Sequence, residues 1–377
     1  MDDRIEVPKK RKRVGSFIFI LVNIVVVVIL GTFEFRGLTV IALKDVASLW
    51  IVNWPYFLIV LASPLIILFA ETLKYVLLIR TATGRIRFGL AWKTAVYGKY
   101  YDNVTPLGSG GQAFQMVCLH QGGVSQGVSG SLPIFGFFFM QLAFFVIGVT
   151  VFVFNGDVIQ STVIRVLAWI GLAFSFVFPL TFLILSLMPR FAGKTIRFVV
   201  NCLVRLKIVK NSEKLEHKIN QTIADYSGSM AIVKNATGTM ILSFFLSIAY
   251  QIVLCSIPYF VVKACGVDAP WVDMFSLCVF TYAAIGIVPT PGNSGAAELS
   301  FAFIFTVLSH GYLLWGMVLW RFSSYYMLLI LGLIMMMIDR WAKMRAEKQN
   351  RIGLDAANSI PIMEEEHPSD SPGTSNS

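Results

Sequence analysis

Two charged residues, Arg321 and Glu298, occupy stretches of the sequence that are otherwise apolar. Arg321 lies well inside the apolar run 312–338, and Glu298 follows a break rich in proline and glycine at 288–298. A charged side chain at membrane depth normally pairs with another charge or faces a water-filled cavity. We therefore expect these residues to form an ion pair or to share an anionic ligand. An ion pair that merely fixes helix packing is the alternative.

The break before Glu298 has a counterpart earlier in the chain. The pattern Thr-Pro-x-x-Ser-Gly occurs at 105–110 and again at 290–295, each time inside a weakly apolar region. Proline removes a backbone donor, and unpaired peptide groups within a membrane must be buried in protein or line a wet cavity. Two packing kinks without function are the alternative. We predict that both breaks line a ligand path with these residues: Asp102, Asn103, Thr105, Pro106, Ser109, Gln112, Thr290, Pro291, Asn293 and Ser294.

The helices around the breaks carry two further expectations. Glu71 and Lys74 are one helical turn apart in an apolar run, so we expect them to pair. Ser109, and either Asn293 or Ser294 in the second break, are expected to cap the half-helices that follow. Helix N-termini attract anions, so those half-helices together with Arg321 would form an anion site.

Composition places these residues in a membrane protein. The chain has 377 residues, of which 56% are hydrophobic and only 14% are charged. Soluble domains carry about 25% charged residues, so a soluble globular protein is excluded. The five cysteines include no Cys-x-x-Cys pair, and we expect neither a disulfide framework, nor a metal site, nor a cofactor.

The apolar pattern predicts an all-α polytopic membrane fold. We expect the weaker regions 88–119 and 271–309 to be two re-entrant hairpins of half-helices, and eight or more full spans are the alternative. Because the repeated pattern occurs once in each half, we expect an internal repeat that is inverted in the membrane. About six full spans are predicted, near 14–32, 50–79, 128–154, 163–187, 240–262 and 312–338.

The basic residues predict the orientation. Most of them lie in segments that the positive-inside rule places in the cytoplasm, so both termini are expected there. The predicted organisation is a basic N-terminus (1–13), a first membrane half (14–187), cytoplasmic amphipathic helices (188–235), a second membrane half (236–340) and a disordered tail (341–377).

The cytoplasmic segment predicts a helix on the membrane surface. Its basic residues recur at helical spacing with apolar residues on the other face, which indicates binding to anionic lipids. We expect no nucleic-acid partner, because no recognised module accompanies the charges. The residues expected at the lipid surface are Arg190, Lys194, Arg197 and Arg205.

Catalytic chemistry is not predicted. Ser109 lies between glycines, but none of the four histidines lies well inside a predicted span, and a serine nucleophile needs a base within reach. Asp102 has no second mid-span aspartate in the setting that an intramembrane aspartyl protease needs. We therefore expect no catalytic residue.

Two stretches resemble one known family. The first runs from Tyr100-Tyr101-Asp102-Asn103-Val104-Thr105-Pro106 through Gly111-Gln112-Ala113-Phe114-Gln115, and it resembles the lysylphosphatidylglycerol synthase transmembrane-region family. The second, from Pro289-Thr290-Pro291-Gly292 through Glu298 to Arg321 and Tyr325-Tyr326, is similar to that family's second signature. The resemblance covers roughly residues 14–345.

The resemblance implies a function. In two-part members the membrane region moves lysyl-phosphatidylglycerol to the outer leaflet, and a separate soluble domain makes that lipid. This chain ends soon after its last predicted span, so we expect no acyl-transfer domain. The resemblance thus implies a bacterial, multi-pass cell-membrane flippase for an anionic or aminoacylated phospholipid. The alternatives are a membrane component of a phosphatidylglycerol lysyltransferase and a structural scaffold. The expected partners are the phospholipid substrate, anionic lipids, a separate synthase or glycosyltransferase, and further copies of the chain.

Overall fold

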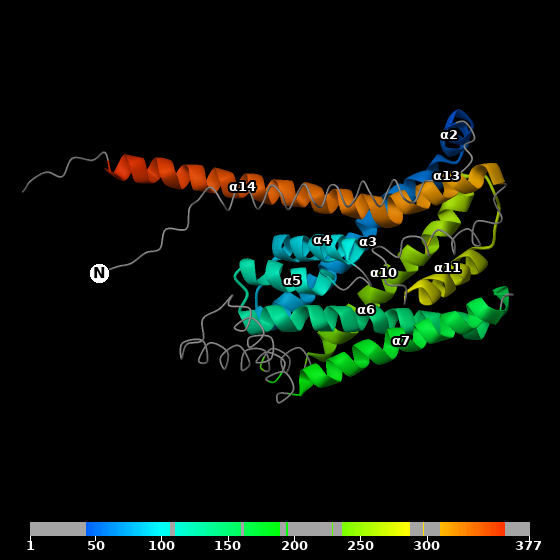
Figure 1. Ribbon diagram of the computed structural model, residues 1–377, viewed down its shortest axis with the longest axis horizontal. Helices are drawn as coiled ribbons and strands as arrows, with labels where there is room; N and C mark the ends of the chain where they lie inside the picture. Colours follow the sequence, from blue (N-terminus) through cyan, green and yellow to red (C-terminus); the bar gives the residue numbers. More distant parts are fainter. Residues whose placement is uncertain are drawn as a thin grey trace, which may run out of the picture. The chain divides into compact units, whose positions relative to one another are not determined.

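The computed structural model describes residues 43–105, 110–159, 162–188, 236–286 and 310–358, together with Lys194, Gly228 and Ala297. All elements within these residues are helices, and no strand occurs among them (Figure 1). The chain divides into two compact units, Met1–Leu333 and Ile334–Ser377. The protein is a polytopic all-α membrane protein, as the sequence predicts.

Long apolar helices account for most of the described chain. A helix rises about 1.5 Å per residue, so about 20 residues cross the hydrocarbon core of a bilayer. Five stretches are long and apolar enough to do so, and they match five of the six predicted spans. The other predicted span, 14–32, lies outside the described residues. Four stretches form α3 (Trp54–Thr83), α6 (Gln126–Asn155), α7 (Thr162–Leu187) and α10 (Thr237–Ala264), and the fifth is Trp315–Ala342.

The fifth stretch is built from three consecutive elements. α13 (His310–Arg321) leads into a short π-helical segment, η3 (Phe322–Tyr326), and then into α14 (Met327–Asn358). Two shorter elements complete the outline, namely α2 (Leu43–Val52) before α3 and η1 (Gly156–Val158) after α6.

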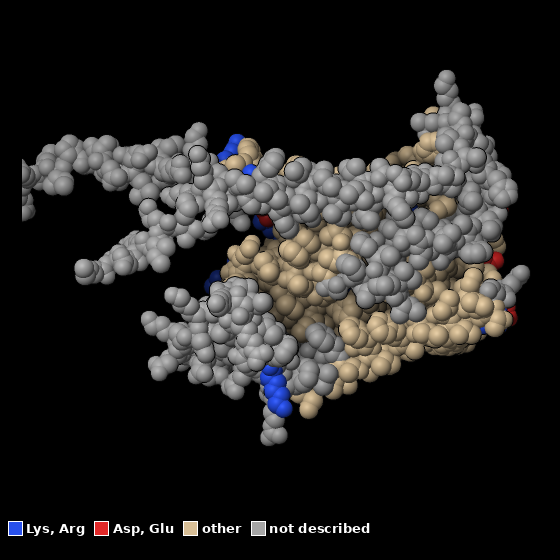
Figure 2. All heavy atoms as spheres, viewed as in Figure 1, with Lys and Arg blue, Asp and Glu red and all other residues tan. Residues whose placement is uncertain are grey.

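The outward faces of the long helices are apolar. On α7, Val166, Ile170, Phe174, Val177 and Phe178 are about half exposed and follow helical spacing. Figure 2 shows a surface over α6 and α7 that is almost entirely uncharged, with charged side chains gathered toward its two ends. A wide apolar surface on a helical protein fits contact with lipid, because exposing so much apolar surface to water is unfavourable.

Helices from the two halves of the chain pack together in the core. α3 packs along α10, and the hydroxyls of Thr81 and Thr239 are 2.7 Å apart across that interface. α7 packs against α11 (Trp271–Ile285) at Gly171, where an added Cβ would strike the carbonyl oxygen of Ala283. Glycine therefore lets these two helices approach closely, as is common between membrane helices.

The first weakened region forms two short helices. α4 (Phe88–Val104) has 17 residues and α5 (Gly110–Gln121) has 12, so each is shorter than the roughly 30 Å hydrocarbon core requires. The two helices pack on one another, and the ring of Tyr101 stacks on Phe114. These lengths match the predicted half-helices, and the hairpin's depth in a bilayer stays a prediction.

The second weakened region is described only as far as its first helix. α11 has 15 residues and is likewise too short for a comfortable crossing. Apart from Ala297, the second break and the predicted return helix lie outside the described residues.

Helix positions agree with the predicted internal repeat. The two copies of the sequence pattern are 185 residues apart, as Thr105 and Thr290 show. When 185 is added to the residue numbers of α3, α4 and α6, the resulting ranges overlap α10, α11 and the stretch from α13 into α14, respectively. An offset shared by three elements in the same chain order is expected of a structural repeat. Its inverted orientation stays a prediction.

The terminal and cytoplasmic predictions have mixed outcomes. The expected disorder from 341 onward is wrong for 341–358, because α14 continues to Asn358 through a run rich in strong helix formers such as Ala, Lys, Arg and Glu. Within this second unit the Arg345 guanidinium lies 3.5 Å from the centre of the Trp341 ring. Of the four residues expected at the lipid surface, only Lys194 is described, and it is exposed and helical. The other three, Arg190, Arg197 and Arg205, lie outside the described residues.

Candidate functional site

A cavity of about 310 Å³ lies among the helices of the first unit. It is reached by the middle portions of α3, α6 and α10, by α4 and α5 near the first break, by the end of α11, and by η3. Since α6 and α10 contribute from the middle of their length, we expect the cavity to lie near half membrane depth. Its charged and amide-bearing wall residues are Glu71, Lys99, Asp102, Asn103, Gln112, Gln115, Gln141, Gln251 and Arg321.

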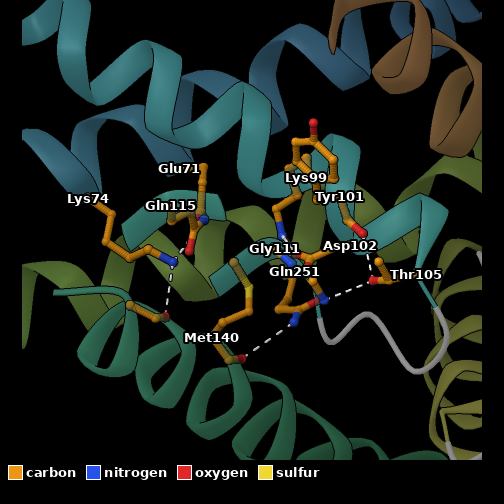
Figure 3. A network of polar contacts seen from close by, with 12 residues as sticks. Glu71, Lys74, Lys99, Tyr101, Asp102, Thr105, Gly111, Gln115, Met140 and Gln251 are labelled. Carbon is orange, nitrogen blue, oxygen red and sulfur yellow. Dashed lines mark hydrogen bonds and ion pairs between the residues drawn. The ribbon is translucent and has the colours of Figure 1, made fainter. Parts of the chain in front are cut away.

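Side chains from the end of α4 close the first break. Thr105 Oγ1 accepts a hydrogen bond from the Gly110 N–H at 2.8 Å and donates to the Tyr101 carbonyl at 2.7 Å. Asp102 Oδ1 accepts from the Gly111 N–H at 3.1 Å (Figure 3). Both bonds satisfy N–H groups that the start of a helix leaves without intrahelical partners.

This capping changes the expected anion site. The cap predicted at Ser109 lies outside the described residues, as does Pro106, whereas Asp102 and Thr105 bind the first donors of α5. An anionic ligand would have to displace the Asp102 carboxylate to use the Gly111 N–H. Among the described residues, the positive charges that line the cavity are those of Lys99 and Arg321.

Glycine at position 111 makes the Asp102 contact sterically feasible. An added Cβ there would strike the Asp102 carboxylate and would lie 2.6 Å from the Gly98 carbonyl oxygen. At Gly98 itself, a Cβ would strike the Gln115 amide. The two glycines thus let α4 and α5 approach closely enough for Asp102 to reach the start of α5.

Two lysine–carboxylate pairs lie at the cavity. Glu71 Oε2 is 2.8 Å from Lys74 Nζ, and both side chains are almost completely buried, which confirms the predicted pair. Lys74 also donates to the Gly136 carbonyl at 3.2 Å. The second pair, Lys99 and Asp102, is looser at 3.9 Å.

Arg321 reaches the cavity from the last turn of α13. Its side chain is buried, and its guanidinium carbon is 4.7 Å from the centre of the Trp320 ring and 5.4 Å from that of Tyr325. The Tyr325 hydroxyl donates to the Asn103 carbonyl at 3.3 Å, which ties η3 to the end of α4. Short π-helical segments are frequent at functional sites, and η3 begins directly after Arg321.

Four of the predicted site residues reach the cavity wall. They are Asp102, Asn103, Gln112 and Arg321, while Thr105 acts in the adjoining cap. The expected pairing of Arg321 with Glu298 is untested. The predicted residues that lie outside the described chain are Pro106, Ser109, Thr290, Pro291, Asn293, Ser294 and Glu298.

The end of α11 links the second break to the same cavity. Tyr282, in the last turn of α11, and Gly286, just after that helix, line the cavity together with residues next to the first break. Both interrupted regions therefore contribute to one space, as far as the described residues extend.

Sequence reasoning did not assign several polar wall residues to the site. The Tyr75 hydroxyl donates to Gln115 Oε1 at 2.7 Å, joining α3 to α5, and Gln251 Nε2 donates to the Met140 carbonyl at 3.5 Å. Gln251 could have been found, since a glutamine in the middle of an apolar span is unusual. Tyr75 gave no such signal, because tyrosine is ordinary in membrane helices.

The charges around the cavity are of both signs. Among the described residues, the cations are Lys74, Lys99 and Arg321, and the carboxylates are Glu71 and Asp102. Ionised groups in a weakly polar interior interact strongly and are kept there only with partners or access to water. The described residues contain no cluster of three or more side chains able to hold a metal ion.

The fold and the cavity together define a polytopic membrane protein with a charged interior site. A family model described as "Lysylphosphatidylglycerol synthase TM region" matches residues 18–332, which include every cavity residue named above. The chain belongs to this family, which confirms the resemblance seen in the sequence and supports a membrane-domain role in lipid handling. Comparison with curated proteins and with solved structures finds no match in either.

Proposed function

We propose that the protein is a flippase that moves an anionic or aminoacylated phospholipid between the two leaflets of the cell membrane, with both of its termini in the cytoplasm. The observation that supports this most is a cavity lined by Lys99, Asp102, Glu71 and Arg321 among helices long and apolar enough to cross a membrane. Charged residues inside a membrane are costly and commonly mark the path of a polar substrate. A lipid head group is the polar group that has to cross this region.

The cavity suits a head group in size and in chemistry. Its volume of about 310 Å³ is near the lower end of the roughly 300–1,000 Å³ of small-molecule pockets. The phosphodiester would bind Arg321 and Lys99, since cations form strong, charge-assisted hydrogen bonds with phosphate. Glu71 would receive an amine of an aminoacylated head group. The acyl chains would stay in the surrounding bilayer.

The internal repeat supplies a route for alternating access. Transporters built from inverted repeats place their site where broken helices meet, and they open it by moving one repeat against the other. Here the first break and the last turn of α11 border the same cavity. α3 and α10, which correspond in the repeat, pack along one another and would form the common axis.

The family description supports one second candidate. The family's name refers to a synthase, so the chain could instead serve as the membrane component of aminoacyl-phospholipid synthesis with a separately encoded enzyme. In that case the chain alone would move no lipid, and its cavity would bind lipid only for presentation to the partner.

Leaflet-resolved transport in proteoliposomes tests the proposal. The purified chain is reconstituted with labelled phosphatidylglycerol or lysyl-phosphatidylglycerol, and label in each leaflet is measured over time. Arg321→Ala should lower the rate at least about tenfold, because about 1.4 kcal/mol of lost phosphate binding already has that effect. Arg85→Ala, in an exposed loop, is the matched control and should transport normally. Equal rates for protein-containing and protein-free vesicles would refute flippase activity.

A further inference from the structure

Asp102 stands between the first break and the cavity. Its Oδ1 accepts from the Gly111 N–H at 3.1 Å, and its Oδ2 is 3.9 Å from Lys99 Nζ. Its side chain is 23% exposed and lines the cavity. Asp102 is therefore a carboxylate at the wall of an interior cavity, held by one backbone donor and one neighbouring lysine.

The Lys99 ammonium is shared between Asp102 and Tyr250. A separation of 3.9 Å is long for an ion pair, and Lys99 Nζ also lies 4.6 Å from the centre of the Tyr250 ring. Lys99 lines the same cavity. A cation shared in this way can turn to a better partner, and a phosphate oxygen at hydrogen-bond distance is a better partner.

We propose that binding of an anionic phosphodiester at this site makes Asp102 take up a proton, so that the protein couples lipid movement to proton movement. The inference rests on the proposed flippase function and identifies the phosphodiester as the group that the coupling site recognises. When the phosphate draws Lys99 away, Asp102 keeps the Gly111 N–H but loses its cation. A carboxylate in a weakly polar site without a cation favours its neutral form.

The step is balanced in charge and atoms. One proton from the solvent forms an O–H bond on the Asp102 carboxylate, no other covalent bond changes, and one negative phosphodiester enters. The net charge of the cavity is the same before and after. Moving a proton with the anion thus avoids leaving an uncompensated charge at membrane depth.

The other groups near Asp102 leave Lys99 as the deciding cation. On α3, Glu71 opposes the ionised form of Asp102 and Lys74 favours it, and these two are paired with each other at 2.8 Å. Both hydroxyls among its titratable neighbours are phenolic and neutral near pH 7. The charged and titratable groups with an electrostatic effect on Asp102 include Lys99, Glu71, Lys74, Tyr75 and Tyr250, and Arg321 lines the same cavity.

Calorimetry of lipid binding tests the inference. Phosphatidylglycerol is titrated into the purified full chain in buffers of different ionisation enthalpy, which yields the number of protons taken up. We expect about one proton per lipid, and an affinity that strengthens up to about tenfold for each unit of falling pH.

Asp102→Asn should reduce the uptake to near zero. Lys99→Gln should do the same, because Asp102 would then be protonated before lipid arrives. Asp268→Asn removes an exposed carboxylate that also pairs with a lysine, Lys263, and should keep the full uptake.

Each contrary outcome has a separate meaning. Lipid binding without proton uptake by the wild-type chain, as expected if Arg321 alone holds the phosphate, overturns the coupling and leaves the proposed flippase standing. Uptake that survives Asp102→Asn but disappears in Glu71→Gln moves the proton to Glu71 and overturns the assignment. If neither lipid binding nor lipid transport is seen for the wild-type chain, the proposed function falls and the inference falls with it.

Discussion

Replacing Lys74 with methionine would test whether the charges at the cavity are held by pairing. Methionine is similar in length and apolar, so Lys74→Met removes the charge while preserving most of the packing. Glu71 would then keep a carboxylate that is 4% exposed and has lost its partner at 2.8 Å. The Gly136 carbonyl would lose its Lys74 donor as well.

The expected effect is large. Removing one member of a buried ion pair costs about 3–5 kcal/mol, because an uncompensated charge remains. Adding Glu71→Gln to Lys74→Met should recover much of that loss, since the stranded charge is gone. The free energy of unfolding is measured by denaturation in mixed micelles, with the two single variants and the double variant forming a thermodynamic cycle.

A surface ion pair provides the control. Lys263 pairs with Asp268, which is 91% exposed, so Lys263→Met should change stability little. A Lys74→Met variant as stable as the Lys263→Met variant would refute the reasoning, because the Glu71 charge would then have water or another partner. A double variant no better than Lys74→Met alone would show that packing, not charge, is lost.

Two further substitutions test the close packing around the cavity. Gly111→Ala should destabilise the protein by about 1–3 kcal/mol, because the new methyl group strikes Asp102, whereas Gly89→Ala meets nothing within 4 Å and should show no such loss. Tyr75→Phe should cost about 1–3 kcal/mol, because Gln115 Oε1 loses its donor in a buried place. Unfolding midpoints of the purified variants check both, and equal midpoints for Gly111→Ala and Gly89→Ala would contradict the first.

The sequence predicts the framework of this fold well because membranes impose simple rules. Apolar length marks a span, and five of the predicted spans coincide with long apolar helices. Proline, glycine and charge are conspicuous against that background, which is why the breaks led directly to Asp102, Asn103 and Gln112 at the cavity wall. Arg321 was found by the same contrast.

Other features depend on helix rotation and contact, which the sequence does not specify. Tyr75 and Tyr250 line the cavity because of how α3 and α10 are turned, and an apolar helix offers no amphipathic pattern from which to read that. The first cap is another example. Serine before a helix is the usual cap, yet Thr105 and Asp102 reach forward to bind Gly110 and Gly111.

The most direct test of the account is whether lipid passes through this cavity. Ser324→Trp would fill the cavity from η3 without altering any charge, and Ser175→Trp on α7 is a matched control remote from its wall. Leaflet-resolved transport of labelled phosphatidylglycerol is measured for both variants after equal thermal stability has been verified. The account predicts that Ser324→Trp blocks transport and that Ser175→Trp transports as the wild type does. Transport at the wild-type rate through Ser324→Trp would contradict it, because the head group would then cross elsewhere.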